Sequence, residues 1–323
     1  MASWGAGNPS ATIAVDLRGS QVRGVAVNQP TLMGRSQRMP QRRRALPELF
    51  ETGYRAFADR CRAVDEPGVA VIAVHELTGR AEGIVTLRAR VERHVAAIVG
   101  RHDSSDLYLT QSAELALRHL IVILDPVSSW KPGDASVQFR VLDLRTGTGF
   151  VDEQGRTLRG LRCEGPAMLR CADHALFLLP LGDPSDWPAS ASDAWGFLPE
   201  RVYFDELLRC PEGSFTHLPQ RNASTRKSMI FRTHGPRDSS ESLATSGGAI
   251  AGTLDLIGPN LAGQITIGSD EMRDGVLLGR YARCDSAKYT DDPSMSRVHA
   301  LMNQIGDRVQ LIDTASINGT RLY

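Results

Sequence analysis

The sequence of residues 276–323 is VLLGRYARCDSAKYTDDPSMSRVHALMNQIGDRVQLIDTASINGTRLY, and this stretch decides the fold. In its segments HALMNQ and RVQLID, the side chains fall into two sets that would point to opposite faces of a strand: His299, Leu301 and Asn303 against Ala300, Met302 and Gln304, and Val309, Leu311 and Asp313 against Gln310 and Ile312. Alternation with a period of two, interrupted by Gly, Asp, Asn and Ser, is typical of short β-strands joined by turns. Asn318-Gly319 is a strong turn dipeptide because both residues tolerate a positive φ. The stretch therefore predicts a small all-β domain whose loops cluster on one edge.

The predicted loops carry residues that are suited to holding an oxyanion. Arg280 supplies a planar fork of donors that matches two phosphate oxygens, Arg297 adds a second cation, and Ser296 adds a hydroxyl donor. Taken one at a time, these side chains are more often solvated surface groups without a function. In combination they favour capture of a phosphate, and no base and nucleophile are obviously paired beside them.

The order and spacing of these motifs resemble the forkhead-associated (FHA) family, whose members are phosphothreonine-binding β-sandwiches. The resemblance implies that Arg280 and Ser296 contact the phosphate, with Arg297 nearby. It implies that Asn318 holds the backbone of the ligand through its amide. The residues that it implies for shaping the loops are Gly279, His299, Gly319 and Thr320.

Two features depart from the family pattern. Ile317 stands where many members carry a threonine, and its alkyl side chain has no donor, so affinity or residue preference is expected to differ. The family continues for several strands beyond its Asn-Gly-Thr loop, whereas this sequence ends at Tyr323. We therefore expect the domain at 250–323 to be truncated at its C-terminus or completed by another chain, with an unpaired sheet edge.

Residues 67–183 repeat the same arrangement of motifs, with several of the motif residues replaced. His119 follows Arg101 by 18 positions, much as His299 follows Arg280 by 19 positions. Asp143 follows His119 by 24 positions, whereas Asp313 follows His299 by 14 positions. The extra ten positions match the turn-rich insert DPVSSWKPGD at 125–134, and the two segments align once it is removed. This alignment indicates an internal duplication.

The first copy lacks most of the phosphate-binding donors. Ala116 stands in place of the serine, Leu117 in place of the second arginine, and Thr148 in place of the asparagine, while the turn glycine is kept as Gly149. The sequence therefore predicts a degenerate FHA-like domain that does not bind phosphothreonine.

The remaining segments are expected to connect or extend the two copies. Residues 1–44 form an extension with a possible hairpin and a basic run, which is either a solvated linker or a contact for nucleic-acid phosphates. Residues 45–66 have the apolar spacing of an amphipathic helix that packs on the following domain or binds a partner. Residues 184–249 are a linker, partly disordered, with a short helix at 200–210 and with Thr225 as a kinase substrate or part of a plain tether.

Composition narrows the classes of function. Lys+Arg and Asp+Glu number 37 each, so the net charge gives no basis for a nucleic-acid or membrane partner. The five cysteines have no metal-binding spacing and the N-terminus has no leader pattern, which indicates a reducing, cytoplasmic environment. We find no P-loop, kinase loop set, GxSxG or zinc motif, and so expect no catalytic residue, cofactor or metal.

Together these observations predict a mainly β protein with two FHA-like β-sandwich domains, the second incomplete, an N-terminal helix and disordered linkers. The expected function is that of an adaptor in Ser/Thr kinase signalling. Its partner would be a phosphothreonine-containing protein, either a Ser/Thr kinase or the substrate of one. Two alternatives stay open: an accessory region of a larger enzyme whose catalytic part lies beyond residue 323, and a scaffold whose sandwiches only bind protein.

Overall fold

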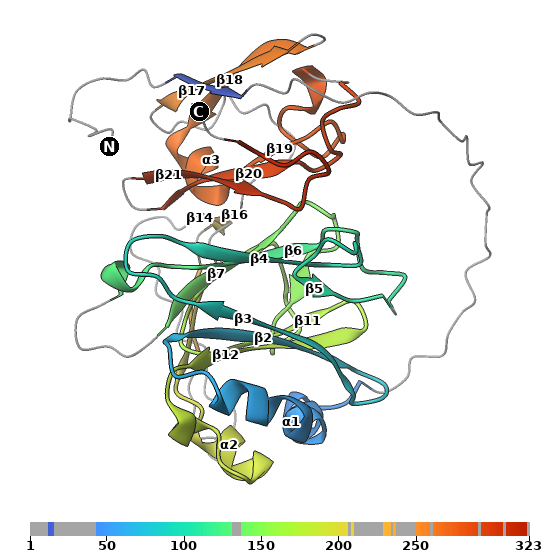
Figure 1. Cartoon of the computed structure of the whole chain (residues 1–323), viewed down its shortest axis with the longest axis vertical. Helices are drawn as coiled ribbons and strands as arrows, with labels where there is room; N and C mark the ends of the chain where they lie inside the picture. Colours follow the sequence, from blue (N-terminus) through green and yellow to red (C-terminus); the bar gives the residue numbers. More distant parts are fainter. Residues whose placement is uncertain are drawn as a thin grey trace.

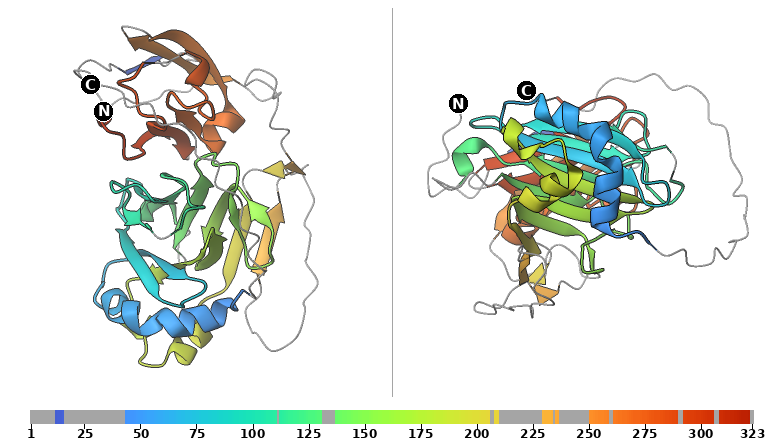
Figure 2. Two further views of the ribbon diagram at one scale, coloured as in Figure 1. Left: turned by 90° about the vertical axis from the view of Figure 1, so that its right-hand side faces the viewer. Right: turned by 90° about the horizontal axis from the view of Figure 1, so that it is seen from below.

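The computed structural model is mainly β, as the alternating patterns predicted, and it includes the N-terminal helix (Figure 1). Two bodies lie one above the other along the long axis (Figures 1 and 2), and we call residues 68–181 the first module and residues 250–321 the second module. None of the helices that the model describes is long and apolar enough to cross a membrane. The described residues are 12–15, 43–110, 112–130, 137–205, 208–209, 229–233, 235–236, 250–258, 261–289, 292–305 and 308–321.

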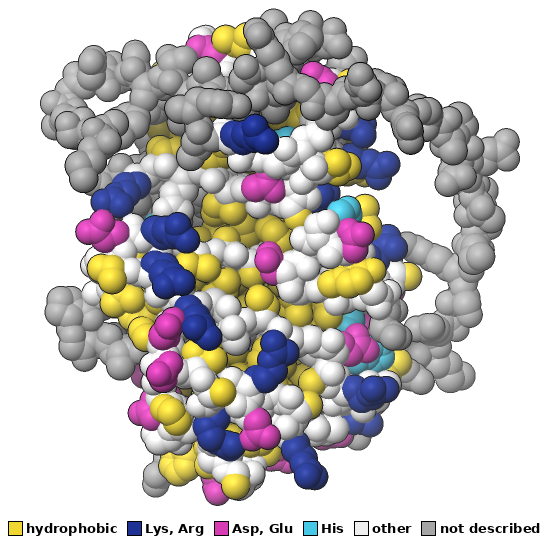
Figure 3. All heavy atoms as spheres, in the orientation of Figure 1, with side chains coloured by type: hydrophobic (Ala, Val, Ile, Leu, Met, Phe, Trp, Pro, Cys, Tyr) yellow, Lys and Arg dark blue, Asp and Glu magenta, His cyan; other side chains and the backbone are white. Residues whose placement is uncertain are grey.

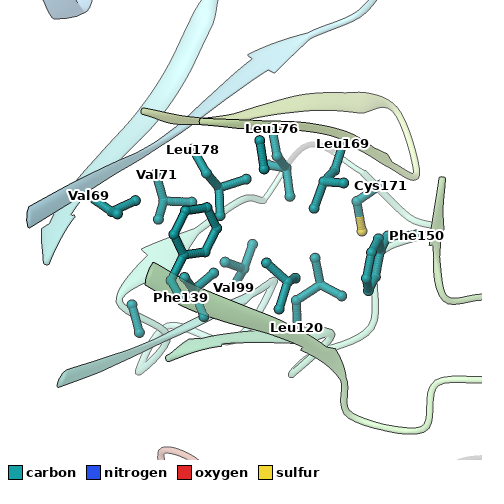
Figure 4. Close-up of a cluster of buried hydrophobic side chains, with 14 of the residues drawn as sticks. Val69, Val71, Val99, Leu120, Phe139, Phe150, Leu169, Cys171, Leu176 and Leu178 are labelled. Carbon is teal, nitrogen blue, oxygen red and sulfur yellow. The ribbon is translucent and has the colours of Figure 1, made fainter. Parts of the chain in front are cut away.

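The first module is a sandwich of two sheets that pack face to face. One sheet has the order β3-β2-β12-β11-β8-β9, and the other has the order β15-β13-β10-β7-β6-β4-β5. Inward side chains of the two sheets meet in a dry core, where Val71 and Leu178 face Phe139 and Phe150 closes one end (Figure 4). The strands run β2 (Gly68–His75), β3 (Ala81–Arg88), β4 (Val95–Gly100), β5 (Leu107–Tyr108), β6 (Leu120–Leu124), β7 (Gln138–Asp143), β8 (Phe150–Val151), β9 (Thr157–Leu158), β10 (Gly160–Glu164), β11 (Ala167–Cys171) and β12 (His174–Leu181).

Helix α1 (Leu46–Arg62) covers the outer face of the β2–β12 sheet, on the side away from the second module (Figure 1). Phe50 and Phe57 of this helix pack in one cluster with Phe177 of β12. The short helix α2 (Ala191–Phe197), which the sequence analysis missed, packs beside α1. The apolar face of α1 is thus occupied within the chain, which favours the predicted packing role over a partner-binding role. The 3-10 turns of this module are η1 (Val127–Ser129) and η2 (Pro184–Asp186).

The prediction of a helix at 200–210 is wrong, because residues Arg201–Asp205 form strand β13. β13 pairs antiparallel with β10 and parallel with β15 (Met229–Thr233), so the expected linker extends a sheet of the first module. Burial alternates along this segment as it does in a strand, since Tyr203 is wholly buried while its neighbours in sequence are not. The Tyr203 hydroxyl donates to Glu153 (3.0 Å) and accepts from the Met168 N–H (2.8 Å). A two-residue pair, β14 (Leu208–Arg209) with β16 (Gly235–Pro236), follows, and Thr225 lies outside the described residues.

The second module also places two sheets around an apolar core. One sheet has the order β1-β17-β18 and the other the order β19-β20-β21, and Leu254, Ile265 and Met302 meet between them. β1 (Thr12–Val15) pairs parallel with β17 and so covers that edge of its sheet. In the other sheet β21 is an edge strand among the described residues, as was expected of a domain without its closing strands, whereas its counterpart β7 pairs with β10. The rest of the predicted N-terminal hairpin lies outside the described residues. The other elements are β17 (Ile250–Gly258), β18 (Leu261–Gly268), α3 (Ser269–Asp274), β19 (Val276–Leu278), η3 (Ala287–Tyr289), β20 (Ala300–Ile305) and β21 (Arg308–Asp313).

Candidate functional site

Arg280 is held along the loop that leads to Ser296. Its backbone N–H donates to the Ser296 carbonyl (3.2 Å), and its Nε donates to the Met295 carbonyl (2.9 Å). Gly279 allows this approach, because a Cβ at that position would lie 2.3 Å from the Arg297 carbonyl oxygen. The Arg280 side chain is exposed, so its guanidinium is fixed through Nε while the two terminal nitrogens remain available to a ligand.

The Ser296 side chain is oriented by the other loops of the site. Ser296 is buried, and its Oγ accepts a hydrogen bond from the Ile317 N–H (2.9 Å), which leaves the hydroxyl proton for an outside acceptor. His299 Nδ1 accepts from the Ser296 N–H (3.2 Å). Burial lowers the pKa of His299, although the charge of Asp313 and the backbone of Gly319 act in the opposite direction. His299 is thus a neutral residue that fixes the loop.

Asp313 organises the loop after β21. Its carboxylate accepts from the Ser316 N–H (2.7 Å), the Ser316 hydroxyl (2.6 Å) and the Thr320 hydroxyl (2.6 Å). Burial raises the pKa of Asp313, but these hydrogen bonds outweigh burial and hold the pKa below its ordinary value. Gly319 has a φ of 70°, which a glycine adopts without strain. Thr320 and Gly319 therefore lie where residues that shape the loop are expected.

Three exposed side chains form the rim of the site. The Asn318 Nδ2 donates to the Ser294 carbonyl (2.5 Å), so its amide is tethered beside the serine loop. The Arg297 side chain is exposed, and its backbone carbonyl accepts from the Tyr281 N–H (3.0 Å). Ile317 is 83% exposed and offers an alkyl surface next to the amide. The structure thus brings all of the predicted site residues together on one edge of the second module.

Sequence analysis missed two residues of this edge, Tyr281 and Arg283, which lie in the loop after Arg280. The Arg283 guanidinium lies over the Tyr281 ring, 5.4 Å from its centroid, and the tyrosine is 51% exposed. Their nearness in sequence to Arg280 is the only signal that could have found them.

The first module reproduces the geometry of this site without its donors. Arg101 donates from its N–H to the Ala116 carbonyl (3.1 Å) and from its Nε to the Leu115 carbonyl (2.8 Å). His119 Nδ1 accepts from the Ala116 N–H (3.0 Å), and its Nε2 contacts the Gly149 carbonyl (3.1 Å). The two arginine contacts and the His119 Nδ1 contact have counterparts in the second module, so the internal alignment made from the sequence agrees with these hydrogen bonds.

The differences between the modules lie at the positions of the predicted phosphate and peptide donors. Ala116 has no hydroxyl, Leu117 has no charge, and the Thr148 hydroxyl turns to Thr146 (3.0 Å). Arg101 is exposed and held as Arg280 is, but no second donor accompanies it at these positions.

A comparison with protein-family models found one match, which lies in the second module. Residues 276–322 match the family model of the FHA domain. This part of the chain is an FHA domain. No curated protein matches the chain.

The chain is also similar to several solved structures. The FHA domain of CT664 from Chlamydia trachomatis is 13% identical, with a TM-score of 0.27, over 35% of this chain and 96% of that one. EmbR from Mycobacterium tuberculosis, in complex with a low-affinity phosphopeptide, is 19% identical, with a TM-score of 0.24, over 34% of this chain and 24% of that one. Full-length yeast Pml1p is 12% identical, with a TM-score of 0.28, over 45% of this chain and 100% of that one.

Other kinds of site find little support in the described parts of the chain. The described parts of the chain contain no group of three or more His, Cys, Asp or Glu side chains that could hold a metal ion. On the face shown in Figure 3, Lys and Arg side chains are scattered among acidic and apolar ones and do not gather into one basic patch. A small pocket lined by Phe50, Trp187 and Phe197 lies between α1 and α2, on the first module.

Proposed function

We propose that this chain is a non-catalytic adaptor whose FHA domain binds a partner protein phosphorylated on threonine. The observation that carries the proposal is the alignment of Arg280 along the backbone of residues 295 and 296, which fixes the guanidinium against the loop that carries Ser296. A phosphate ester carries a charge of about −1.5 to −2 at neutral pH and offers three acceptor oxygens. Arginine and serine donors match that charge and those acceptors.

The hydrogen bonds of the site support binding over turnover. A catalytic serine needs a base that accepts its hydroxyl proton. Here His299 Nδ1 accepts from the Ser296 backbone N–H and not from the hydroxyl, while the hydroxyl oxygen accepts from Ile317. The histidine therefore holds the loop in place, and the serine is a donor to the ligand.

The rest of the site supports recognition of a peptide and not of free phosphate alone. Asn318 stands on the rim with a side-chain amide that can bond a peptide backbone, and the exposed Ile317 can pack against a neighbouring side chain. The partner that we propose is a Ser/Thr kinase or the substrate of one. The first module, which lacks the serine and the asparagine, has no part in reading the phosphate.

Calorimetry on the whole chain tests the proposal. The probes are a pool of phosphothreonine peptides with randomised flanking positions and the same pool without phosphate. We expect heat of binding with the phosphorylated pool alone, and only weak competition by inorganic phosphate. Equal binding of the two pools would refute the proposal.

A further inference from the structure

The two modules meet through corresponding strands, which pack face to face. Ile121 of β6 and Leu142 of β7 share one buried apolar cluster with Leu277 of β19 and Leu301 of β20. The two sides also share a hydrogen bond. The Leu277 N–H donates to Asp285 at 2.8 Å, and in β4 the Ile98 N–H donates to Asp106 at 2.8 Å. The first module therefore lies directly behind the strands that carry the recognition loops of the FHA domain.

Arg118 reaches from the first module into the FHA domain. It is only 6% exposed, and its Nη2 donates a short hydrogen bond to the carbonyl of Ala315. Burial lowers the pKa of Arg118, while the nearby carboxylate of Asp313 acts in the opposite direction. A buried guanidinium beside that carboxylate makes a charge-assisted bond to the carbonyl, which is stronger than a neutral one.

The bonded carbonyl belongs to the loop that completes the ligand site. Ala315 has a φ of 60°, a left-handed conformation that is unfavourable for a residue with a Cβ unless its surroundings hold it. Two residues later, the Ile317 N–H donates to Ser296 Oγ, and Asn318 follows with its tethered amide. The position of the Ala315 carbonyl therefore determines where the backbone places Ile317 and Asn318.

A second arginine of the first module, Arg145, contacts the loop that begins with Arg280. Arg145 occupies the position in the first module that Ala315 occupies in the second, and it also has a positive φ, 54°. Its Nη1 donates to Asp285 Oδ1 (2.5 Å), while Asp285 Oδ2 accepts from the Leu277 N–H (2.8 Å). Asp285 ends the loop that Arg280 begins. The loop that begins with Arg280 and the loop that carries Asn318 thus each have a charged contact from the first module.

We propose that Arg118 is a positioning residue for the FHA recognition loop, so that the degenerate first module sets the affinity of the second for its phosphothreonine ligand. The consequence for affinity rests on the proposed function, whereas the consequence for loop order does not. The degenerate module thereby acts on the ligand through the loop, without touching the phosphate.

Two substitutions of Arg118 and one control separate positioning from simple attachment of the modules. Arg118→Met removes the donors but keeps an unbranched apolar stem in the buried site, and Arg118→Ala removes both. The control is Arg308→Ala, because Arg308 also donates across the modules to a carbonyl, that of Glu92 (3.2 Å), but from the other end of β21. We expect both Arg118 variants to weaken binding of the phosphothreonine peptide pool about tenfold. The control should bind as the wild type does.

Hydrogen–deuterium exchange of the full chain without ligand provides the second readout. In the Arg118 variants, exchange should become faster in peptides covering residues 314–321, and in the control it should not. Unchanged exchange in both Arg118 variants would overturn the inference, as would an equal loss of peptide binding in the control. If the wild type binds no phosphothreonine peptide but the Arg118 variants still loosen the loop, the proposed function fails and the positioning role stands.

Discussion

Replacing Arg280 with alanine should remove most of the phosphopeptide binding, whereas the same change at Arg101 should leave it unaltered. The guanidinium is already held by its Nε bond to the Met295 carbonyl (2.9 Å), so little side-chain freedom is lost when a ligand binds. Loss of such a charge-assisted contact costs about 2–3 kcal/mol, or roughly a 30- to 150-fold weaker Kd. Calorimetric titration of the phosphothreonine peptide pool measures this ratio directly.

The Arg101→Ala variant makes the comparison sharp, because it loses the same structural bond, from Nε to the Leu115 carbonyl (2.8 Å). Any effect of the missing side chain on loop stability should therefore appear in both variants, and thermal unfolding should show similar shifts. The difference in Kd between them isolates the contact with the ligand. A loss below about threefold for Arg280→Ala, or an equal loss for Arg101→Ala, would contradict the assignment of the phosphate site to the second module.

Two further predictions concern stability. Tyr203→Phe should destabilise the first module by about 1–3 kcal/mol in urea unfolding, because the buried Met168 N–H loses its acceptor; an unchanged midpoint would contradict this role of the hydroxyl. The folded chain should lose stability as the pH falls below about 6.5, because burial lowers the pKa of both His119 and His299 and the unfolded chain then binds more protons. Urea midpoints at pH 7.5 and 5.5 measure this, and equal midpoints would contradict it.

The sequence was most informative where one local pattern had one structural cause. The alternation in HALMNQ and RVQLID predicted β20 and β21, and the spacing from Arg101 to His119 located the first copy of the domain. The loop motifs were informative for the same reason, since Gly279 and His299 serve local backbone contacts that recur at Gly100 and His119. Such contacts lie within one module and leave a trace in residue spacing.

Features that depend on contacts between distant segments were missed. The segment ERVYFDELLRC has apolar residues compatible with a helix, but pairing with β10 and burial of Tyr203 make its first part a strand. The pairing of β1 with β17 joins residues too far apart in sequence for any local pattern to show it. One signal of the module contact was present, because LIVIL in β6 is apolar at every position and buried on both faces.

The pairing of two related modules suggests why a copy without phosphate donors still matters to the site. In both modules the second residue after the end of β7 or β21 adopts a positive φ, at Arg145 and at Ala315. In the FHA domain that loop carries Asn318, whose amide donates to the Ser294 carbonyl, whereas in the first module the position of Ala315 carries a side chain that crosses to Asp285. Binding and loop order are linked, so a contact that favours the bound loop conformation also raises affinity. A module that has lost its own ligand contacts can therefore still act on the ligand of its neighbour, provided that its side of the shared interface is retained.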